Sequence, residues 1–350
     1  MRNDHRTEWY TAQVVDGGHI LRELDVEDDA TVTRQLSADT HGTGSVSVSL
    51  QQVDEIPWET CQIRIWYHQP GRDIPLLTGI PSVGDEEYEP GRVVVSVDLF
   101  DPTSMLADEQ IGQMWGVNTE TPVLEAVRGL IASVTSGVPV VFDDSTATLA
   151  AAITWSDDTS KLAIINQLLA AIGWNPLWAD PMGRLRSEPV VDPAIREIKW
   201  AFTDDAGSLI VPGWKRTTNR SGIPNRLRCI QRVDGNKPAD VAVVTNEDPN
   251  SPFSFQGRGG RWITRTERDV DAADFDTLQT IAAQKLREQT QVTGEFSFSH
   301  PVLDFSVGDV VTFRHSRIGP TPIRCQCTSQ RITCRAGQMV ASTFQEVVNV

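Results

Sequence analysis

The sequence predicts a β-rich α+β chain: two regions of β-barrel or β-sandwich type, a small α/β region between them, and one further helix in the C-terminal part. Short stretches that alternate apolar and polar residues, or that are rich in β-branched residues, fill residues 10–103 and return after Trp200. Turn-forming residues separate these stretches at the spacing typical of sandwiches and small barrels. Two stretches with helical periodicity lie between the β-rich regions.

Five strands are predicted in the first β-rich region. They are residues 11–15, 30–36, 45–51, 61–67 and 92–100, with turns at Asp16-Gly17-Gly18, His41-Gly42-Thr43-Gly44, Gln69-Pro70-Gly71-Arg72 and Glu89-Pro90-Gly91. Side chains alternate between the two faces of a strand, so Cys61, Ile63, Ile65 and Tyr67 share one face. Gln62, Arg64 and Trp66 share the other.

The middle region contains two predicted helices. The first begins at Thr121-Pro122, where a hydroxyl can cap the helix and Pro occupies the first helical position. Its apolar stripe is Val123, Val127, Leu130, Ile131 and Val134, and it stops at Ser136-Gly137.

The second helix has an apolar face formed by Leu162, Ile165, Leu168, Leu169 and Ile172. Asp158, Thr159 or Ser160 can cap it, and Gly173 supplies a left-handed stop. A strand over 174–179, a turn over 180–183 and a returning strand over 184–187 follow. This segment carries no reactive constellation, and we expect it to join the β-rich regions.

The C-terminal region returns to strands, interrupted by one helix over about 272–289. The predicted strands are residues 225–232, 240–246, 261–265, 295–299, 307–314, 323–330 and 339–345. The helix buries Phe275, Leu278, Ile281, Ala282 and Leu286, with Asp271 or Asp274 as its cap. The predicted domains are therefore residues 1–103, 104–195 and 196–350, the last with a helical insertion at about 271–290.

Charge is distributed unevenly along the chain. The net charge is −16, yet residues 1–195 hold 11 basic and 30 acidic side chains, whereas residues 196–350 hold 20 basic and 17 acidic ones. Clustered Lys and Arg are needed to neutralise phosphates, so a conventional DNA-binding surface is disfavoured. The acidity is either a solvated surface or a surface that borders a basic partner or something that must not adhere.

The N-terminus lacks the apolar core of a signal peptide, and no run is long enough to span a bilayer, so no membrane segment is predicted. Five cysteines, an odd number, argue against a disulfide scaffold. Cys325, Cys327 and Cys334 have a weak zinc-site spacing without a nearby fourth ligand. We expect them to be small buried hydrophobic residues.

The sequence predicts no catalytic, cofactor-binding or metal-binding residues. Neither a P-loop nor a nucleophile elbow occurs, and the six histidines are scattered. His41-Gly42-Thr43-Gly44 is expected to be a hairpin turn. The run from Gly257 to Trp262 (GRGGRW) is expected to be a flexible basic turn, with partner contact as the alternative. Adjacent acids such as Asp157-Asp158 fit turns and helix caps better than the converging pair of a glycosidase.

The order of these segments resembles the hub proteins of tailed-phage baseplates and tail tips, the minor tail proteins of siphophages among them. The resemblance covers nearly the whole chain and lies in the segments Leu77–Gly79, Arg92–Asp98, Leu162–Leu185, Asn225–Leu227, Pro301–Asp304, Val307–Val311 and Cys334–Met339. It is a pattern of order and spacing.

The resemblance implies a homotrimeric structural virion protein, not an enzyme, at the tail tip, assembled in the bacterial host cytoplasm. Each subunit would supply two tail-tube-like β-domains, so that three chains match the sixfold distal tail or tail-tube ring. Other minor tail or fibre proteins and the tape-measure protein would be neighbours. DNA would pass through a central channel without specific binding during ejection, and N-terminal carboxylates are expected to face that lumen or a basic neighbour.

Three other functions remain open on the sequence: the hub of a contractile injection or secretion apparatus, a carbohydrate-binding or receptor-binding attachment module, and a cell-wall hydrolase.

Overall fold

A computed structural model describes most of the chain: residues 7–26, 29–38, 40–53, 55–89, 92–135, 137–218, 222–231, 238–249, 251–270, 272, 275–290 and 294–347. Contacts divide the chain into two compact units, which we call the first unit (residues 1–214 with 297–344) and the second unit (residues 215–296 with 345–350). The predicted boundaries near residues 103 and 195 both lie within the first unit and remain predictions.

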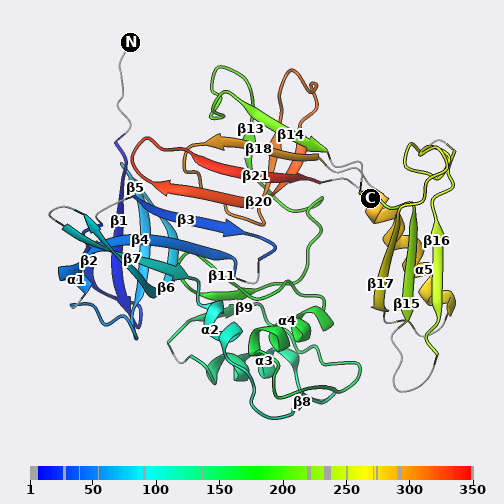
Figure 1. Ribbon diagram of the computed structural model, residues 1–350, viewed down its shortest axis with the longest axis horizontal. Coiled ribbons are helices and arrows are strands. Elements are labelled where there is room, and N and C mark those ends of the chain that lie inside the picture. Colours follow the sequence, from blue (N-terminus) through cyan, green and yellow to red (C-terminus); the bar gives the residue numbers. More distant parts are fainter. Residues whose placement is uncertain are drawn as a thin grey trace. The chain divides into compact units, whose positions relative to one another are not determined.

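A sheet of thirteen strands combines strands from both ends of the sequence (Figure 1). Its order is β14-β18-β21-β20-β3-β4-β7-β6-β5-β1-β2, and β19 pairs with both β20 and β13. The strands are β1 (Trp9–Asp16), β2 (His19–Leu24), β3 (Ala30–Gln35), β4 (Gly42–Ser49), β5 (Gln62–Gln69), β6 (Arg72–Glu89), β7 (Arg92–Phe100), β13 (Ile198–Phe202), β14 (Trp214–Thr218), β18 (Gly294–His300), β19 (Val310–Phe313), β20 (Ile323–Cys334) and β21 (Val340–Glu346). The prediction of a β-rich chain with few helices is confirmed.

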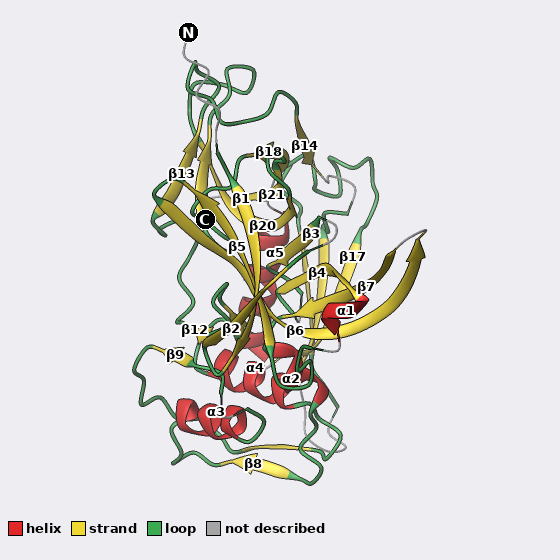
Figure 2. Ribbon diagram, turned by 90° about the vertical axis from the view of Figure 1, so that its left-hand side faces the viewer, coloured by secondary structure: helices red, strands yellow, loops and turns green. Residues whose placement is uncertain are grey.

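All five strands predicted near the N-terminus are present, as β1, β3, β4, β5 and β7. The alternation predicted for β5 is also confirmed, because Ile63, Ile65 and Tyr67 are almost completely buried. The sequence analysis missed β2 and β6. β6 contains Gly79 and Gly84, which interrupt the strand signal, and it runs beside β7 as a long curved hairpin (Figure 2).

The predicted hairpin turn at His41-Gly42-Thr43-Gly44 is wrong, because β4 already begins at Gly42. These glycines allow close backbone approach instead. A Cβ on Gly44 would lie 2.6 Å from the Thr31 carbonyl oxygen, too close for any side chain. The Gly42 N–H donates to the buried carboxylate of Asp101 at 2.6 Å, which fixes the point where β7 ends.

The first core lies inside the curved N-terminal sheet and is mostly aliphatic. It includes Val14, Val32, Val46, Val48, Ile63, Ile65, Tyr67, Leu76, Val97, Leu99 and, from the C-terminal strands, Ile332 and Val340. β20 contributes because it pairs antiparallel with β3, with Ile332 opposite Val32. The two β-rich regions of the sequence therefore share one sheet and one core.

A second cluster in the first unit is aromatic and surrounds His300. The ring centroids of Phe298 and Phe344 lie 4.7 Å apart, and Phe202 and Phe305 lie 5.3 and 5.2 Å from His300. Each of these rings is nearly fully buried. The cluster packs strands β13, β18 and β21 together.

The middle region forms an α/β cluster with its own core. It contains α2 (Thr103–Asp108), α3 (Val123–Ala132), α4 (Lys161–Ala171), β8 (Trp115–Val117), β9 (Val140–Phe142), β10 (Ile153–Trp155), β11 (Trp178–Ala179) and β12 (Leu185–Ser187), while the short α1 (Leu50–Val53) follows β4. Ser160 caps α4 and Gly173 ends it with φ 72°, as predicted. The strand predicted over 174–179 is shorter, because only Trp178–Ala179 pair with β12.

The predicted cap of α3 is wrong. The hydroxyl of Thr121 donates to the side-chain oxygen of Asn118, and Pro122 stands at the N-cap position without a side-chain cap. The helix ends at Ala132, and Ser136 of the predicted stop lies outside the described residues.

The turn between β11 and β12 holds the α/β cluster against the N-terminal strands. The Thr78 hydroxyl donates to the Pro181 carbonyl at 2.9 Å, and the buried Arg64 donates to Thr78 at 2.8 Å. Gly183 has φ 80° and lies so close to Thr78 that a Cβ would be 3.0 Å from its methyl group. This contact attaches the α/β cluster to the N-terminal strands, and its role in joining the two β-rich regions remains a prediction.

The second unit contains a three-stranded sheet covered on one face by a helix. The order is β16 (Val241–Thr245), β15 (Arg226–Gln231), β17 (Thr264–Val270), and the helix is α5 (Phe275–Thr290). Leu227, Cys229, Ala242, Leu278, Ala282 and Leu286 form its core. The helix is predicted correctly, but the predicted burial of Phe275 is wrong, because this side chain in the first turn is 45% exposed. The proposed caps Asp271 and Asp274 lie outside the described residues. No described helix is long and apolar enough to cross a membrane.

Candidate functional site

The outer face of the main sheet, opposite its aliphatic core, is dominated by serine and threonine. The register aligns these side chains across five strands, because Ser329 and Thr333 of β20 share the face with residues of β3, β4, β7 and β6. The other hydroxyls of this face, which we call the hydroxyl face, belong to Thr31, Thr33, Thr43, Ser45, Ser47, Ser49, Ser82 and Ser96. Thr31 and Ser45 hydrogen-bond to each other at 2.8 Å.

Charged side chains are sparse on the hydroxyl face. Among the side chains that the structure describes on this face, the charged ones are Asp98 and Arg331. Ile80 and Phe100 make one end apolar. The alternation in Gly42–Ser49 (GTGSVSVS) was the sequence signal for this face. The surface offers short polar groups and lacks the clustered cations that would hold a polyanion.

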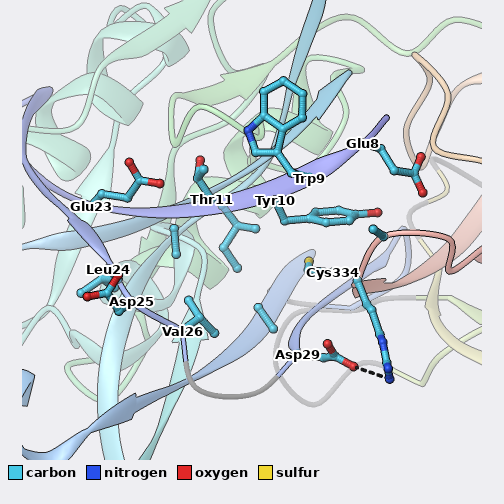
Figure 3. A pocket seen from close by; sticks show the side chains of 15 residues that line it. Glu8, Trp9, Tyr10, Thr11, Glu23, Leu24, Asp25, Val26, Asp29 and Cys334 are labelled. Atoms are coloured by element: carbon cyan, nitrogen blue, oxygen red, sulfur yellow. Dashed lines mark ion pairs between the residues drawn. The ribbon is translucent and has the colours of Figure 1, made fainter. Parts of the chain in front are cut away.

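A hollow of about 710 Å³ at the start of β1 is lined by carboxylates (Figure 3). Glu23 and Asp25 lie at one end, and Asp29 forms an ion pair with Arg335 at 3.6 Å. Glu8 accepts hydrogen bonds from the Tyr67 hydroxyl at 2.8 Å and from the Gly337 N–H at 2.6 Å, which ties β1 to the turn after β20.

A second hollow, of about 660 Å³, lies between the N-terminal strands, the β11–β12 turn and residues 306–309. Arg34 lines it and is 8% exposed. Its guanidinium donates to the Gln330 side chain at 3.2 Å, to Ser306 at 3.5 Å and to the Leu76 carbonyl. These acceptors are neutral, and burial lowers the pKa of Arg34 to about 10. The group remains charged at neutral pH and fixes β3 to β6 and β20.

All five cysteines are free thiols and buried, as predicted. Burial raises the pKa of Cys61 to about 11 and that of Cys334 to about 12, and it raises that of Cys327 as well. These three thiols are therefore protonated at neutral pH, and all five cysteines pack as small apolar groups. Within the described part of the chain, no group of three or more His, Cys, Asp or Glu residues is arranged to hold a metal ion.

The loop that contains Gly257–Trp262 is hydrogen-bonded throughout. The N–H groups of Arg258, Gly259 and Gly260 donate to the carbonyls of residues 254, 256 and 255. Phe255 stacks on Trp262 at 4.4 Å. The buried Asn225 side chain bonds to the backbone of residues 261 and 263. These contacts hold the loop in place, and the sequence analysis, which predicted a flexible turn, did not anticipate them.

Comparison with known proteins places this fold among phage tail proteins. No protein-family model and no curated protein matches the sequence. The structure is similar to the tail protein from Neisseria meningitidis (TM-score 0.69, 13% identity, 97% of each chain covered). It is also similar to the 43 kDa tail protein of prophage MuSo2 from Shewanella oneidensis (TM-score 0.64, 13% identity, 96% of this chain and 98% of that one).

A secretion-system protein shares the fold as well. An E. coli component of the type VI secretion system, itself similar to the T4 bacteriophage tail proteins gp27 and gp5, matches with TM-score 0.51 and 12% identity. The match covers all of this chain and 76% of that one. The resemblance to phage tail and baseplate proteins indicated by the sequence is thus confirmed at the level of the fold.

Proposed function

We propose that the chain is a structural, non-enzymatic protein of a phage tail tip or baseplate hub, and that three copies form a ring around a channel. The proposal rests on the hydroxyl face, which we assign to the wall of the channel. The fold shared with phage tail proteins supports it.

The chemistry of the hydroxyl face suits a passage for DNA. Proteins hold DNA by neutralising its phosphates with several Lys and Arg side chains. Among the described side chains of this face, Arg331 and Asp98 are single charges of opposite sign on separate strands, and the remaining polar groups are mainly hydroxyls. A moving duplex would therefore meet no row of cations. DNA would adhere weakly to the channel wall mainly because the wall carries neutral hydroxyls. The carboxylate-lined lumen expected from the sequence remains a prediction.

The same proposal gives the chain its partners and its place. The ring would lie at the virion tail tip between the distal tail or tail-tube ring and the fibre or other minor tail proteins, with the tape-measure protein in the channel until ejection. Two tube-like β-regions per chain would let a trimer match sixfold symmetry. In the structure both regions contribute strands to the same sheet.

The first experiment measures the mass and shape of the purified chain. Light scattering coupled to size exclusion should give about three times 38.6 kDa, and negative-stain images should show a ring with a central hole. A monomer, or a compact trimer without a hole, would contradict the proposal.

The second experiment tests the channel wall directly. Ser47→Lys with Ser96→Lys places two adjacent lysines on the hydroxyl face. In a ring, six such lysines converge on the axis, so affinity for a short DNA duplex should rise at least tenfold at low salt. The matched control is Ala132→Lys with Ala170→Lys, on exposed positions of α3 and α4. Equal affinities of the two variants would refute the wall assignment.

A hub of a contractile secretion apparatus is the second candidate, favoured by the match to the type VI secretion component. Mass spectrometry of purified DNA-containing particles from the source cells separates the two. Presence of the chain in such particles supports the phage tail, and absence from them supports the secretion apparatus.

A further inference from the structure

The second unit has an open sheet face that no described element of that unit covers. α5 packs on the face that carries Leu227, Cys229 and Ala242, so the alternate residues of each strand point away from the helix. In Figure 1 the three strands lie in front of α5. We call the exposed side the arginine face; its members are Arg226, Arg228, Val241, Val243, Thr245, Thr264, Thr266 and Arg268.

The arginine face combines positive charge with apolar surface. Val241 and Val243 are 38% and 50% exposed, and Arg228 lies between Val243 and Thr266 in the register. Arg226 is held in place, because its Nε donates to the Thr264 hydroxyl at 2.8 Å and its guanidinium lies 5.0 Å from the Trp262 ring. None of the described residues on this face is acidic. Exposed valines beside ordered arginines are typical of a protein interface.

The first unit combines negative charge with apolar surface on an edge strand. β2 ends the main sheet. It exposes Leu21, at 52%, at the irregularity in its pairing with β1, and the exposed Glu23 and Asp25 follow two and four residues later. Both carboxylates line the hollow at the start of β1, at the end away from Asp29 (Figure 3). Residues 1–195 carry 30 acidic against 11 basic side chains, so the N-terminal part of the chain is acidic as a whole.

We propose that the arginine face of one copy docks on the β2 strand of a second copy, with Val243 against Leu21 and Arg228 near Glu23 and Asp25. A contact between two different patches of the same chain is head-to-tail, and such contacts form a ring when their rotation closes and a filament when it does not. The inference rests on the proposed assembly of the chain with itself, for which it names the interface. Because the arginine face includes exposed apolar surface, we expect it to bind a protein rather than nucleic acid.

The test is a charge exchange read out by the mass distribution of the full chain at several concentrations. Arg228→Glu alone and Glu23→Arg alone should each weaken association at least tenfold, because each places like charges together. The double variant should recover most of the association. Arg287→Glu, on α5 at the other side of the second unit, is the control and should leave the mass distribution unchanged.

Each other outcome has a defined meaning. A wild-type ring that Arg228→Glu leaves intact overturns this interface while the proposed ring stands. Loss of association without rescue by Glu23→Arg overturns β2 as the docking strand. Loss of duplex DNA binding by Arg228→Glu without any change of mass would make the face a nucleic-acid surface and overturn the inference. A wild-type monomer overturns both proposals. Circular dichroism of every variant shows that it is folded.

Discussion

Acidification from pH 7 to pH 5 is expected to destabilise the first unit through one buried side chain, His300. The ring is 1% exposed and sits in the aromatic cluster with Phe202, Phe305 and Phe344. With Nδ1 donating to the Pro301 carbonyl at 2.6 Å, Nε2 is left to accept from the Ser342 hydroxyl at 2.8 Å. Both nitrogens are satisfied by a neutral imidazole, and protonation would remove the second bond.

Burial lowers the pKa of His300 from 6.5 to about 4. The unfolded chain therefore binds a proton below about pH 6.5 that the folded chain does not bind until about pH 4. Stability is complete above the unfolded value and falls as the pH decreases between the two values. Each pKa unit corresponds to about 1.4 kcal/mol, so the loss is about 2 kcal/mol at pH 5 and about 3 kcal/mol when complete.

The assay is urea unfolding at a series of pH values for the wild type and for His300→Gln, which keeps a neutral donor and acceptor. Carboxylates also titrate in this range, and they contribute equally to both proteins. The difference between the two curves should therefore change by about 2 kcal/mol from pH 7 to pH 5. A difference that does not vary with pH would refute the assignment of a neutral, buried His300.

Two further predictions concern backbone and charge. Gly173→Ala should cost about 1–2 kcal/mol because residue 173 is left-handed, whereas Gly129→Ala, in α3 with open space around it, should gain up to about 1 kcal/mol; equal thermal shifts for both would contradict this. Arg34→Met should cost about 1–3 kcal/mol in urea unfolding because it removes the donor to the Gln330 side-chain oxygen and to the Leu76 carbonyl. Adding Gln330→Leu should restore part of that loss, and a double variant no more stable than Arg34→Met would contradict the argument.

Local signals in the sequence predicted most of the elements. The alternation in β5 and the capped, glycine-stopped helix α4 depend on neighbours within a few residues, and both are present. Where close approach of distant segments decided the structure, the local signal misled. Gly42 and Gly44 look like turn residues, yet they lie in β4 because Asp101 and Thr31 crowd their backbone. β6 was missed for a similar reason, because its glycines Gly79 and Gly84 allow close approach to residues of β7.

Periodicity and composition were sufficient to predict the β-rich class, the positions of the main strands and helices, the buried cysteines and the uneven charge. They could not predict that β20 pairs with β3, that residues 215–296 form a unit with an uncovered basic face, or that hydroxyls from five strands share one face. These features depend on pairing between residues as far as 300 positions apart. Strand periodicity states which side chains share a face but leaves open which strands lie beside each other, since that choice depends on burial summed over the whole core.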